Sequence, residues 1–296
     1  MGEYAWYPHP GPQTIFCSRG EYEVLYGGAA GGGKTDCNIM EATRHIQYPD
    51  YKAVIFRRTF PQLQEIIDRC RQYYPLVGGE YRASDHRWGF PSGATIKLGH
   101  MAESDSHYNY QGDQYQFIAF DEACHFLPKQ LLYLHSRCRT TNPNIPLRVR
   151  YGTNPGGPAH SFLKERFRIG VVEPFTTIYD ELTGLARVFI PAKVGDNPSL
   201  TLNDPDYVLR LMQLPEIERM RLLDGVWDAF EGQMFSQLNQ DVHGFDDELP
   251  TEWESFGAFD WGFARPWTYG IWRVDYDGRL YLDQLHYAIK SGATNI

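Results

Sequence analysis

The strongest constraint on this 296-residue chain is a glycine-rich loop, Gly28-Ala-Ala-Gly-Gly-Gly-Lys34-Thr35. It matches the pattern G-x-x-x-x-G-K-[ST], which is informative only where it joins a strand to a helix. Both elements are predicted here, because a strand-like run at 22–26 precedes the loop and a helix-like run at 34–46 follows it. Glycines let successive backbone N–H groups turn toward phosphate oxygens, and the helix N-terminus adds partial positive charge. The loop therefore predicts a site for nucleotide phosphates.

Each residue type in the loop has an expected task. The glycines should bring the backbone against the phosphates, and they are Gly28, Gly31, Gly32 and Gly33. Lys34 should reach the β- and γ-phosphates of ATP, and the hydroxyl of Thr35 should hold Mg²⁺.

A pair of adjacent acids, Asp121-Glu122, follows a nearly unbroken apolar run at 115–120. Such a run is typical of a parallel strand buried on both faces. Ligands of open α/β sheets gather at the carboxyl ends of the strands. We therefore expect Asp121 to bind Mg²⁺ and Glu122 to polarise the attacking water. A helix cap or two surface acids is the alternative, and the phosphate loop upstream favours hydrolysis.

Two further segments each leave two interpretations open. Thr153-Asn154 ends a predicted strand and is placed to contact the γ-phosphate, yet Asn-Pro-Gly-Gly is also ordinary turn chemistry. Gln13 lies nine residues before the first strand-like run. Its amide is suited to bond an adenine edge, with Phe16 packed on the base; a turn with a core aromatic is the alternative.

Strand-like and helix-like segments alternate along the first two thirds of the chain, which predicts a parallel α/β sheet. Beyond the loop, strands are expected at 52–56, 115–120, 147–151 and 186–190, and a hairpin at 87–98. Helices are expected at 61–73, 127–139, 204–213 and 215–223. From residue 254 the pattern is strand only, with an Asp-Gly hairpin turn at 277–278.

Composition limits the partners of the chain. The net charge of −9 excludes a global basic field for nucleic acid, although arginines cluster at 57–58, 137–139 and 148–150. For Arg148 and Arg150 we favour a solvated face. Five scattered cysteines fit reduced thiols better than a zinc site, and no apolar run approaches the roughly 20 residues of a membrane helix.

Taken together, these motifs resemble the large terminase subunit of tailed bacteriophages, and the resemblance covers essentially the whole chain. It implies a P-loop NTPase domain of the additional-strand, catalytic-glutamate type at 1–235. A linker at 236–252 and the beginning of an RNase H-like nuclease domain at 253–296 would follow. The resemblance also implies ATP and Mg²⁺ as cofactors and packaging of double-stranded DNA.

The family pattern also assigns individual residues and partners. Thr153 and Asn154 match the motif that couples hydrolysis to movement, and Asp260 resembles the first metal-binding aspartate of the nuclease. The implied partners are a portal protein, a small terminase subunit and identical subunits in a ring. The implied setting is the cytoplasm of the bacterial host, with no membrane association.

This sequence departs from the family pattern within the phosphate loop. Many terminases carry an arginine at the position of Ala30, so the transition-state charge must be met from elsewhere. We name Arg58 and Arg137 as catalytic candidates, with Arg57 and Arg139 as further ones, acting within the subunit or from a neighbour. A structural ion pair is the alternative for each of them.

The nuclease part departs as well, because an RNase H-like site needs about three carboxylates on separate elements. Asp260 is present, whereas Asp275 and Asp277 belong to a predicted turn and Asp283 to a strand. We expect a fragment or a truncated prophage product without nuclease activity. The alternatives to a packaging motor are a degenerate terminase fragment that only binds nucleotide, or another P-loop ATPase.

Overall fold

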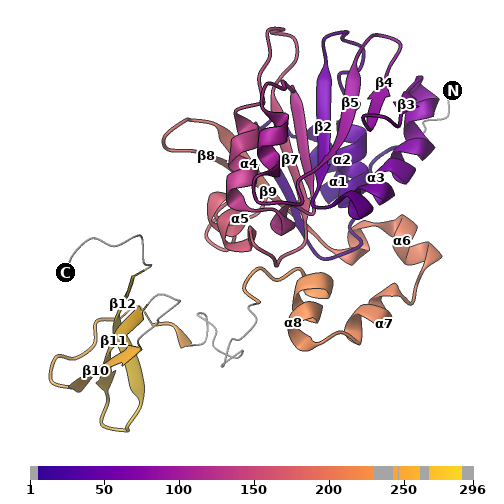
Figure 1. Cartoon of the computed structure of the whole chain (residues 1–296). Coiled ribbons are helices and arrows are strands. Elements are labelled where there is room, and N and C mark those ends of the chain that lie inside the picture. Colours follow the sequence, from indigo (N-terminus) through magenta and orange to yellow (C-terminus); the bar gives the residue numbers. More distant parts are fainter. Residues whose placement is uncertain (1–5, 230–242, 246, 261–266, 289–296) are drawn as a thin grey trace. The chain divides into compact units, whose positions relative to one another are not determined.

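The computed structural model describes residues 6–229, 243–245, 247–260 and 267–288 (Figure 1). The chain divides into two units, Met1–Gln233 and Met234–Ile296. The first unit holds a nine-stranded sheet with helices, and the second holds a three-stranded sheet. All five cysteines are free thiols. Within the described ranges, no helix combines the length and the hydropathy needed to span a bilayer.

The large sheet has the strand order β3-β4-β5-β2-β6-β7-β1-β9-β8. Its strands are β1 (Glu23–Gly28), β2 (Lys52–Arg57), β3 (Glu80–Arg82), β4 (Arg87–Gly89), β5 (Thr95–His100), β6 (Phe117–Asp121), β7 (Arg148–Thr153), β8 (Thr177–Tyr179) and β9 (Ala186–Ala192). The six strands from β5 to β9 in this order are parallel, and antiparallel strands complete both edges. Because β7 lies between β1 and β6, the sheet has the additional strand that the family resemblance implies, and the α/β fold class is confirmed.

Helices cover both faces of this sheet (Figure 1). One face carries α1 (Pro12–Ser18), α2 (Lys34–Glu41) and α3 (Phe60–Tyr73); the other carries α4 (Pro128–His135) and α5 (His160–Arg166). Successive side chains of each strand point to opposite faces of the sheet. In β2, Val54 and Phe56 pack in the cluster with α4 and α5, whereas Ala53 and Ile55 pack in the cluster with α2 and α3.

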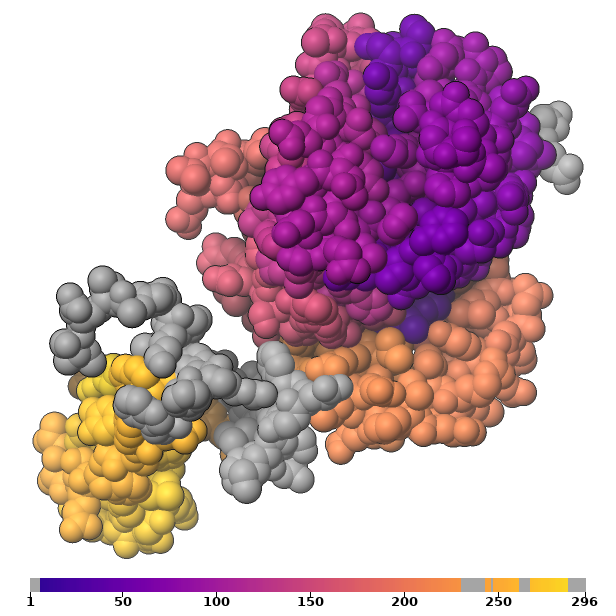
Figure 2. Space-filling view, in the orientation of Figure 1, coloured from indigo at the N-terminus to yellow at the C-terminus, as the bar shows by residue number. Residues whose placement is uncertain are grey.

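A second group of helices follows β9, comprising α6 (Pro198–Asn203), α7 (Tyr207–Met212) and α8 (Glu216–Arg219). Figure 2 shows the orange segment of α7 and α8 packed below the sheet-bearing part of this unit. Short helical turns complete the unit, namely η1 (Tyr74–Val77), η2 (Ser106–Tyr110), η3 (Ala123–His125), η4 (Val194–Asp196) and η5 (Met220–Asp224).

Some boundaries differ from the sequence prediction. The helix after the phosphate loop ends at Glu41, because the amides from Thr43 onward bond three residues back, as Thr43 N does to Met40 O at 3.0 Å. The Thr43 hydroxyl also donates to that carbonyl, at 2.7 Å, which is a local bond that competes with the helix. Helix α4 ends at His135 instead of residue 139, and the short elements α1, β3, β8 and α6 were not predicted.

The prediction that Arg148 and Arg150 form a solvated face is wrong. The side chain of Arg150 is fully buried and donates to the carbonyl oxygens of Arg19 and Glu21 at 3.0 and 3.1 Å. Arg148 pairs with the buried carboxylate of Glu41 at 2.7 Å. The two arginines therefore tie strand β7 to the segment before β1 and to the last residue of α2.

The second unit is an antiparallel meander of β10 (Glu254–Asp260), β11 (Trp267–Val274) and β12 (Leu280–Ala288). The carboxylate of Asp275 accepts the N–H groups of Asp277 and Arg279 at 2.9 and 2.8 Å, and Gly278 has a φ of 80°. The predicted Asp-Gly hairpin is confirmed, since these bonds close the turn between β11 and β12.

Candidate nucleotide-binding site

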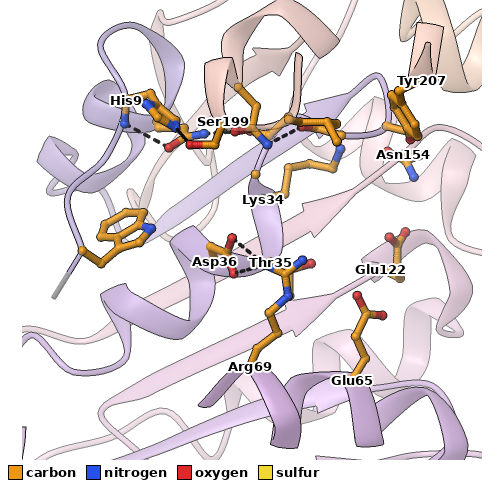
Figure 3. A pocket seen from close by; sticks show the side chains of 18 of the residues that line it. His9, Lys34, Thr35, Asp36, Glu65, Arg69, Glu122, Asn154, Ser199 and Tyr207 are labelled. Carbon is orange, nitrogen blue, oxygen red and sulfur yellow. Dashed lines mark hydrogen bonds and ion pairs between the residues drawn. The ribbon is translucent and has the colours of Figure 1, made fainter. Parts of the chain in front are cut away.

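A cavity of about 690 Å³ lies at the carboxyl ends of β1, β6 and β7 (Figure 3). The phosphate loop lines it from Ala30 to Thr35, and Glu122 and Asn154 enter it from the ends of β6 and β7. Other walls come from residues 6–13 with α1, from α3, and from the segment 197–207. The topology thus brings together the loop, the acidic pair and the segment after β7, which the sequence places far apart.

Backbone geometry explains the glycines of the loop. Gly31 and Gly33 have φ values of 76° and 79°, a region that other residues rarely adopt. A Cβ on Gly33 would lie 2.4 Å from the Gln13 amide nitrogen. A Cβ on Gly28 would lie 2.5 Å from the carbonyl oxygen of Ala192. Gly28 therefore allows β1 and β9 to approach each other, and it does not line the cavity.

Neighbouring segments hold the loop in place. The amide of Ala29 donates to Ala192 O at 2.8 Å, and the amide of Ala30 donates to Leu222 O at 2.7 Å. Asn197 donates its side-chain amide to Gly31 O at 2.8 Å. The loop is consequently fixed to the helical segment after β9 as well as to the sheet.

Lys34 is buried beneath the loop, and its Nζ donates to the carbonyl oxygen of Ala29 at 2.5 Å. Burial lowers the pKa of Lys34 to about 8, although the carboxylates of Glu122 and Asp121 oppose this shift. A buried ammonium bonded to a neutral carbonyl lacks a full counter-charge, so the site is prepared for an anion.

Asp121 is buried where β6 ends and is surrounded by donors. It accepts the Thr35 hydroxyl at 3.1 Å, Arg57 Nε at 2.6 Å and Asn38 Nδ2 at 3.4 Å. Burial raises the pKa of Asp121 to about 6, and the guanidinium of Arg57 opposes the rise. The carboxylate therefore remains mostly ionised at pH 7.

Glu122 adopts a left-handed backbone conformation, with φ 55° and ψ 51°. For a residue with a side chain this costs on the order of 1 kcal/mol. The turn directs Asp121 to Thr35 while Glu122 faces the cavity (Figure 3). The left-handed conformation at Glu122 is supported by the residues that follow it, since the backbone N–H of Cys124 donates to the Thr153 hydroxyl at 3.0 Å.

The two residues after β7 occupy different positions. Thr153 is buried behind the cavity, and its hydroxyl donates to Asn154 O at 2.9 Å. Asn154 lines the cavity, and its buried Oδ1 has no hydrogen-bond partner among the residues that the structure describes. Turn chemistry alone does not explain an orphaned acceptor at a cavity wall, so this atom is a candidate contact for a bound ligand.

Gln13 is buried against the phosphate loop. Its Nε2 donates to Gly32 O at 3.2 Å, and its Oε1 accepts the amide of His9 at 3.0 Å. Phe16 is completely buried and stacks on Tyr26 with the ring centroids 5.5 Å apart. Of the two alternatives for Phe16, the structure shows the core aromatic.

The candidate arginines lie in different places, some at the site and some away from it. Among the described residues that line the cavity, neither Arg58 nor Arg137 occurs. Arg58 donates to Met101 O and, at 3.2 Å, to Gln130 Oε1. Arg137 follows α4 and bonds Tyr115 N through its carbonyl at 2.9 Å, at the amino end of β6. Six residues of extended chain separate Tyr115 from Asp121, which is about 20 Å.

Two arginines do contact the site, namely Arg57, which the sequence also offers as a candidate, and Arg69, which it does not. Arg57 forms a salt bridge with Asp121 at 2.6 Å, and Arg69 of α3 lines the cavity in a salt bridge of 2.9 Å with Asp36. The sequence pattern distinguishes Arg57 from Arg58 only through strand alternation, which sends successive side chains to opposite faces. No signal in the sequence indicates Arg69.

Asp260 ends strand β10 and is exposed, and residues 261–266 lie outside the described part of the chain. Asp283 pairs with Arg273 at 3.0 Å, and Asp275 closes the hairpin turn. Within the described residues there is no group of three or more His, Cys, Asp or Glu side chains placed to hold a metal ion.

We compared the sequence and the fold of this chain with known proteins. The model for the N-terminal part of the T4-like virus type of terminase large subunit matches residues 25–240. No curated protein matches the chain. The large terminase of a thermophilic bacteriophage is 15% identical, with a TM-score of 0.58 over 95% of this chain and 69% of that one.

A second structural neighbour is a mutant of the ATPase domain of the Thermus phage P74-26 large terminase. It is 17% identical, with a TM-score of 0.52 over 74% of this chain and 94% of that one. At these identities the likeness concerns the fold. The family match covers more than two thirds of the sequence and includes both the phosphate loop and the acidic pair. The chain therefore belongs to the family of phage large terminase subunits of the T4-like virus type.

Proposed function

We propose that this chain is the ATP-hydrolysing motor subunit that drives double-stranded phage DNA into a procapsid. The observation that carries the proposal is the strained turn at the end of β6, which gives two adjacent carboxylates different partners. Family membership supports it. Further support comes from the thermophilic phage's large terminase, which has the same fold and has been solved in complex with ADP and with ATP-γ-S.

ATP binding starts from the loop. Its phosphates lie against Gly31, Gly32 and Gly33, and Lys34 exchanges the Ala29 carbonyl for the β- and γ-phosphates. The phosphate charge stabilises the ammonium that burial disfavours. Gln13, which now holds the loop and the His9 amide, recognises the adenine edge from the adjoining wall.

The residues around Asp121 fit a magnesium ion, because the Thr35 hydroxyl and an ionised carboxylate are the hard oxygen donors that Mg²⁺ prefers. Bound there, the ion would neutralise charge on the phosphates. Arg57 shares the Asp121 carboxylate and keeps it in place.

Hydrolysis depends on Glu122, whose carboxylate orients and deprotonates the attacking water. Asn154 lines the cavity and donates its side-chain amide N–H to the γ-phosphate, whose oxygens accept hydrogen bonds, and it responds to the loss of that phosphate. Arg137 supplies transition-state charge from a neighbouring subunit. Arg58 does so only after releasing Met101 and Gln130.

The wider assignments complete the proposal. Residues 1–235 form the motor domain, 236–252 a linker, and 253–296 the beginning of an RNase H-like domain in which Asp260 is one metal ligand. The motor acts as a ring of identical subunits on a portal, with a small terminase subunit, in the bacterial cytoplasm.

The test is the Glu122→Gln variant. Removing the charge while keeping the shape should abolish phosphate release and leave ATP affinity within about threefold, a change of less than one kcal/mol. Glu173→Gln, the same change at an exposed residue, is the matched control. Hydrolysis at the wild-type rate in Glu122→Gln would reject the assignment. Wild-type protein that binds ATP without turning it over would favour the degenerate-fragment alternative.

A further inference from the structure

Helix α5 connects two segments that belong to different parts of the first unit. It begins directly after the loop 154–159, which carries Asn154 at the cavity wall. It also bonds the segment 225–229, the last described stretch before the division of the chain at residue 233. We call 225–229 the exit segment. His160, the first residue of α5, is buried and contacts both the loop and the exit segment.

The hydrogen bonds of His160 determine its protonation. The amide of Gly156 donates to Nδ1 at 2.8 Å, so Nδ1 carries no proton. The proton of the neutral ring is therefore on Nε2, which donates to the carbonyl oxygen of Trp227 at 2.9 Å. The imidazole also stacks on the Trp227 indole, with centroids 5.2 Å apart and planes inclined by 27°. One ring thus binds the loop on one side and the exit segment on the other.

The loop that contacts His160 requires backbone conformations that favour glycine. Gly156 and Gly157 have φ values of 110° and 103°, which residues with side chains rarely adopt. A Cβ on Gly157 would lie 2.6 Å from the carbonyl oxygen of Cys124, two residues after Glu122. The loop that holds Nδ1 is therefore packed directly against the turn that carries the acidic pair.

The exit segment reaches the phosphate loop from the other side. The Trp227 indole covers Gly27 of β1, where a Cβ would lie 2.9 Å from the ring. Leu222, just before the segment, accepts the amide of Ala30. One turn along α5, Lys164 pairs with Asp228. Motion of the exit segment is thus restrained by the nucleotide site and by α5 together.

We propose that His160 is a positioning residue that couples the loop carrying Asn154 to the exit segment, so that nucleotide turnover changes the position of residues 225–229. The inference rests on the proposed function. Hydrogen bonds weaken steeply beyond about 3.2 Å, so a shift of the Gly156 amide by about 1 Å either breaks a bond to the imidazole or carries Trp227 with it.

Amide hydrogen exchange of the full chain tests this with ATP-γ-S, with ADP and without nucleotide. The reporter is the Val226 amide, which bonds Met220 O at 2.9 Å. Wild-type exchange at this amide should differ between nucleotide states by roughly 3- to 10-fold, the range that one hydrogen bond supplies. His160→Asn keeps an acceptor near the Nδ1 position, and His160→Gln keeps a donor near the Nε2 position. In both variants the difference should disappear while ATP binding persists.

Asp228→Asn is the matched control, because it weakens the exit segment without touching the imidazole. It should raise exchange in every state and preserve the nucleotide-dependent difference. A difference that survives in both His160 variants would overturn the inference, whatever their ATPase rate. The inference would also be overturned if Asp228→Asn abolished the nucleotide-dependent difference in exchange. Any loss of contact between α5 and the exit segment would then explain the result, without a specific role for His160. The Glu122→Gln assay decides the proposed function separately, since it measures phosphate release.

Discussion

Thr35 and Asp121 are 86 residues apart in sequence, and the Thr35 hydroxyl lies 3.1 Å from each carboxylate oxygen of Asp121. The contact exists because β1 and β6 are both parallel to β7 and end at the same edge of the sheet. Arg57 completes the group from β2, on the other side of β6. A phosphate loop and an acidic strand end are thus joined before any ligand binds.

Replacing Arg57 with Met should destabilise the protein by about 3–5 kcal/mol, because it leaves the buried Asp121 carboxylate without its guanidinium. Arg58→Met is the matched variant. It removes bonds to Met101 and Gln130 that are worth about 1–2 kcal/mol. Urea unfolding followed by circular dichroism measures both changes. Equal losses in the two variants would contradict the account of Asp121.

ATP affinity should fall as pH rises above about 8. Burial holds the pKa of Lys34 near 8 in the free protein, whereas bound phosphates favour the ammonium, so binding takes up a proton above that pH. The dissociation constant should rise by about tenfold per pH unit, as expected for one coupled proton. The same shift makes the folded state bind fewer protons than the unfolded state, so stability from Lys34 increases over this window.

The measurement is a titration with a fluorescent ATP analogue between pH 7 and 9.5. Lys34→Ala should bind more weakly, and its affinity should not change with pH across this range. A wild-type dissociation constant that is constant up to pH 9.5 would show that Lys34 keeps its proton in the free protein.

Backbone strain at Glu122 gives a prediction that separates stability from activity. Glu122→Gly and Glu122→Ala both remove the carboxylate and should both abolish phosphate release. Because φ is 55° at this position, the glycine variant should be more stable than the alanine variant by about 1 kcal/mol. Thermal and urea unfolding of the two proteins check this order. An alanine variant of equal or greater stability would mean that the turn relaxes once the side chain is removed.

The sequence predicts the parts of this protein that depend on local pattern. The loop 28–35, the strand before Asp121 and the stripe of α3 are each defined by neighbouring residues, and each is present. The site residues that were missed depend on topology. Asn38 and Arg69 join the site because α2 and α3 lie side by side on one face of the sheet.

The sequence pattern also does not predict which charged side chains are buried. In the sequence, Arg150 looks like the exposed residue of an alternating strand. In the structure β7 is a central strand, and the buried guanidinium of Arg150 donates to the carbonyl oxygens of Arg19 and Glu21 just before β1. His160 likewise has no local pattern, since its two partners are four and 67 residues away. Pairwise contacts of this kind require the strand order, which no single segment specifies.

Subunit mixing tests whether Arg137 acts across an interface. Within one chain, Arg137 lies at the amino end of β6 and Glu122 at its carboxyl end, about 20 Å apart, so they cannot serve the same cavity. Glu122→Gln and Arg137→Ala should each be inactive alone. Mixed rings place an intact Glu122 in one subunit next to an intact Arg137 in the neighbour, which should restore phosphate release. Mixing Glu122→Gln with Lys34→Ala is the control: Lys34 and Glu122 line one cavity, so no subunit pair regains a complete site and the mixture should stay inactive. If the Arg137→Ala mixture is also inactive, or if Arg137→Ala alone hydrolyses ATP at the wild-type rate, the transition-state charge comes from another arginine.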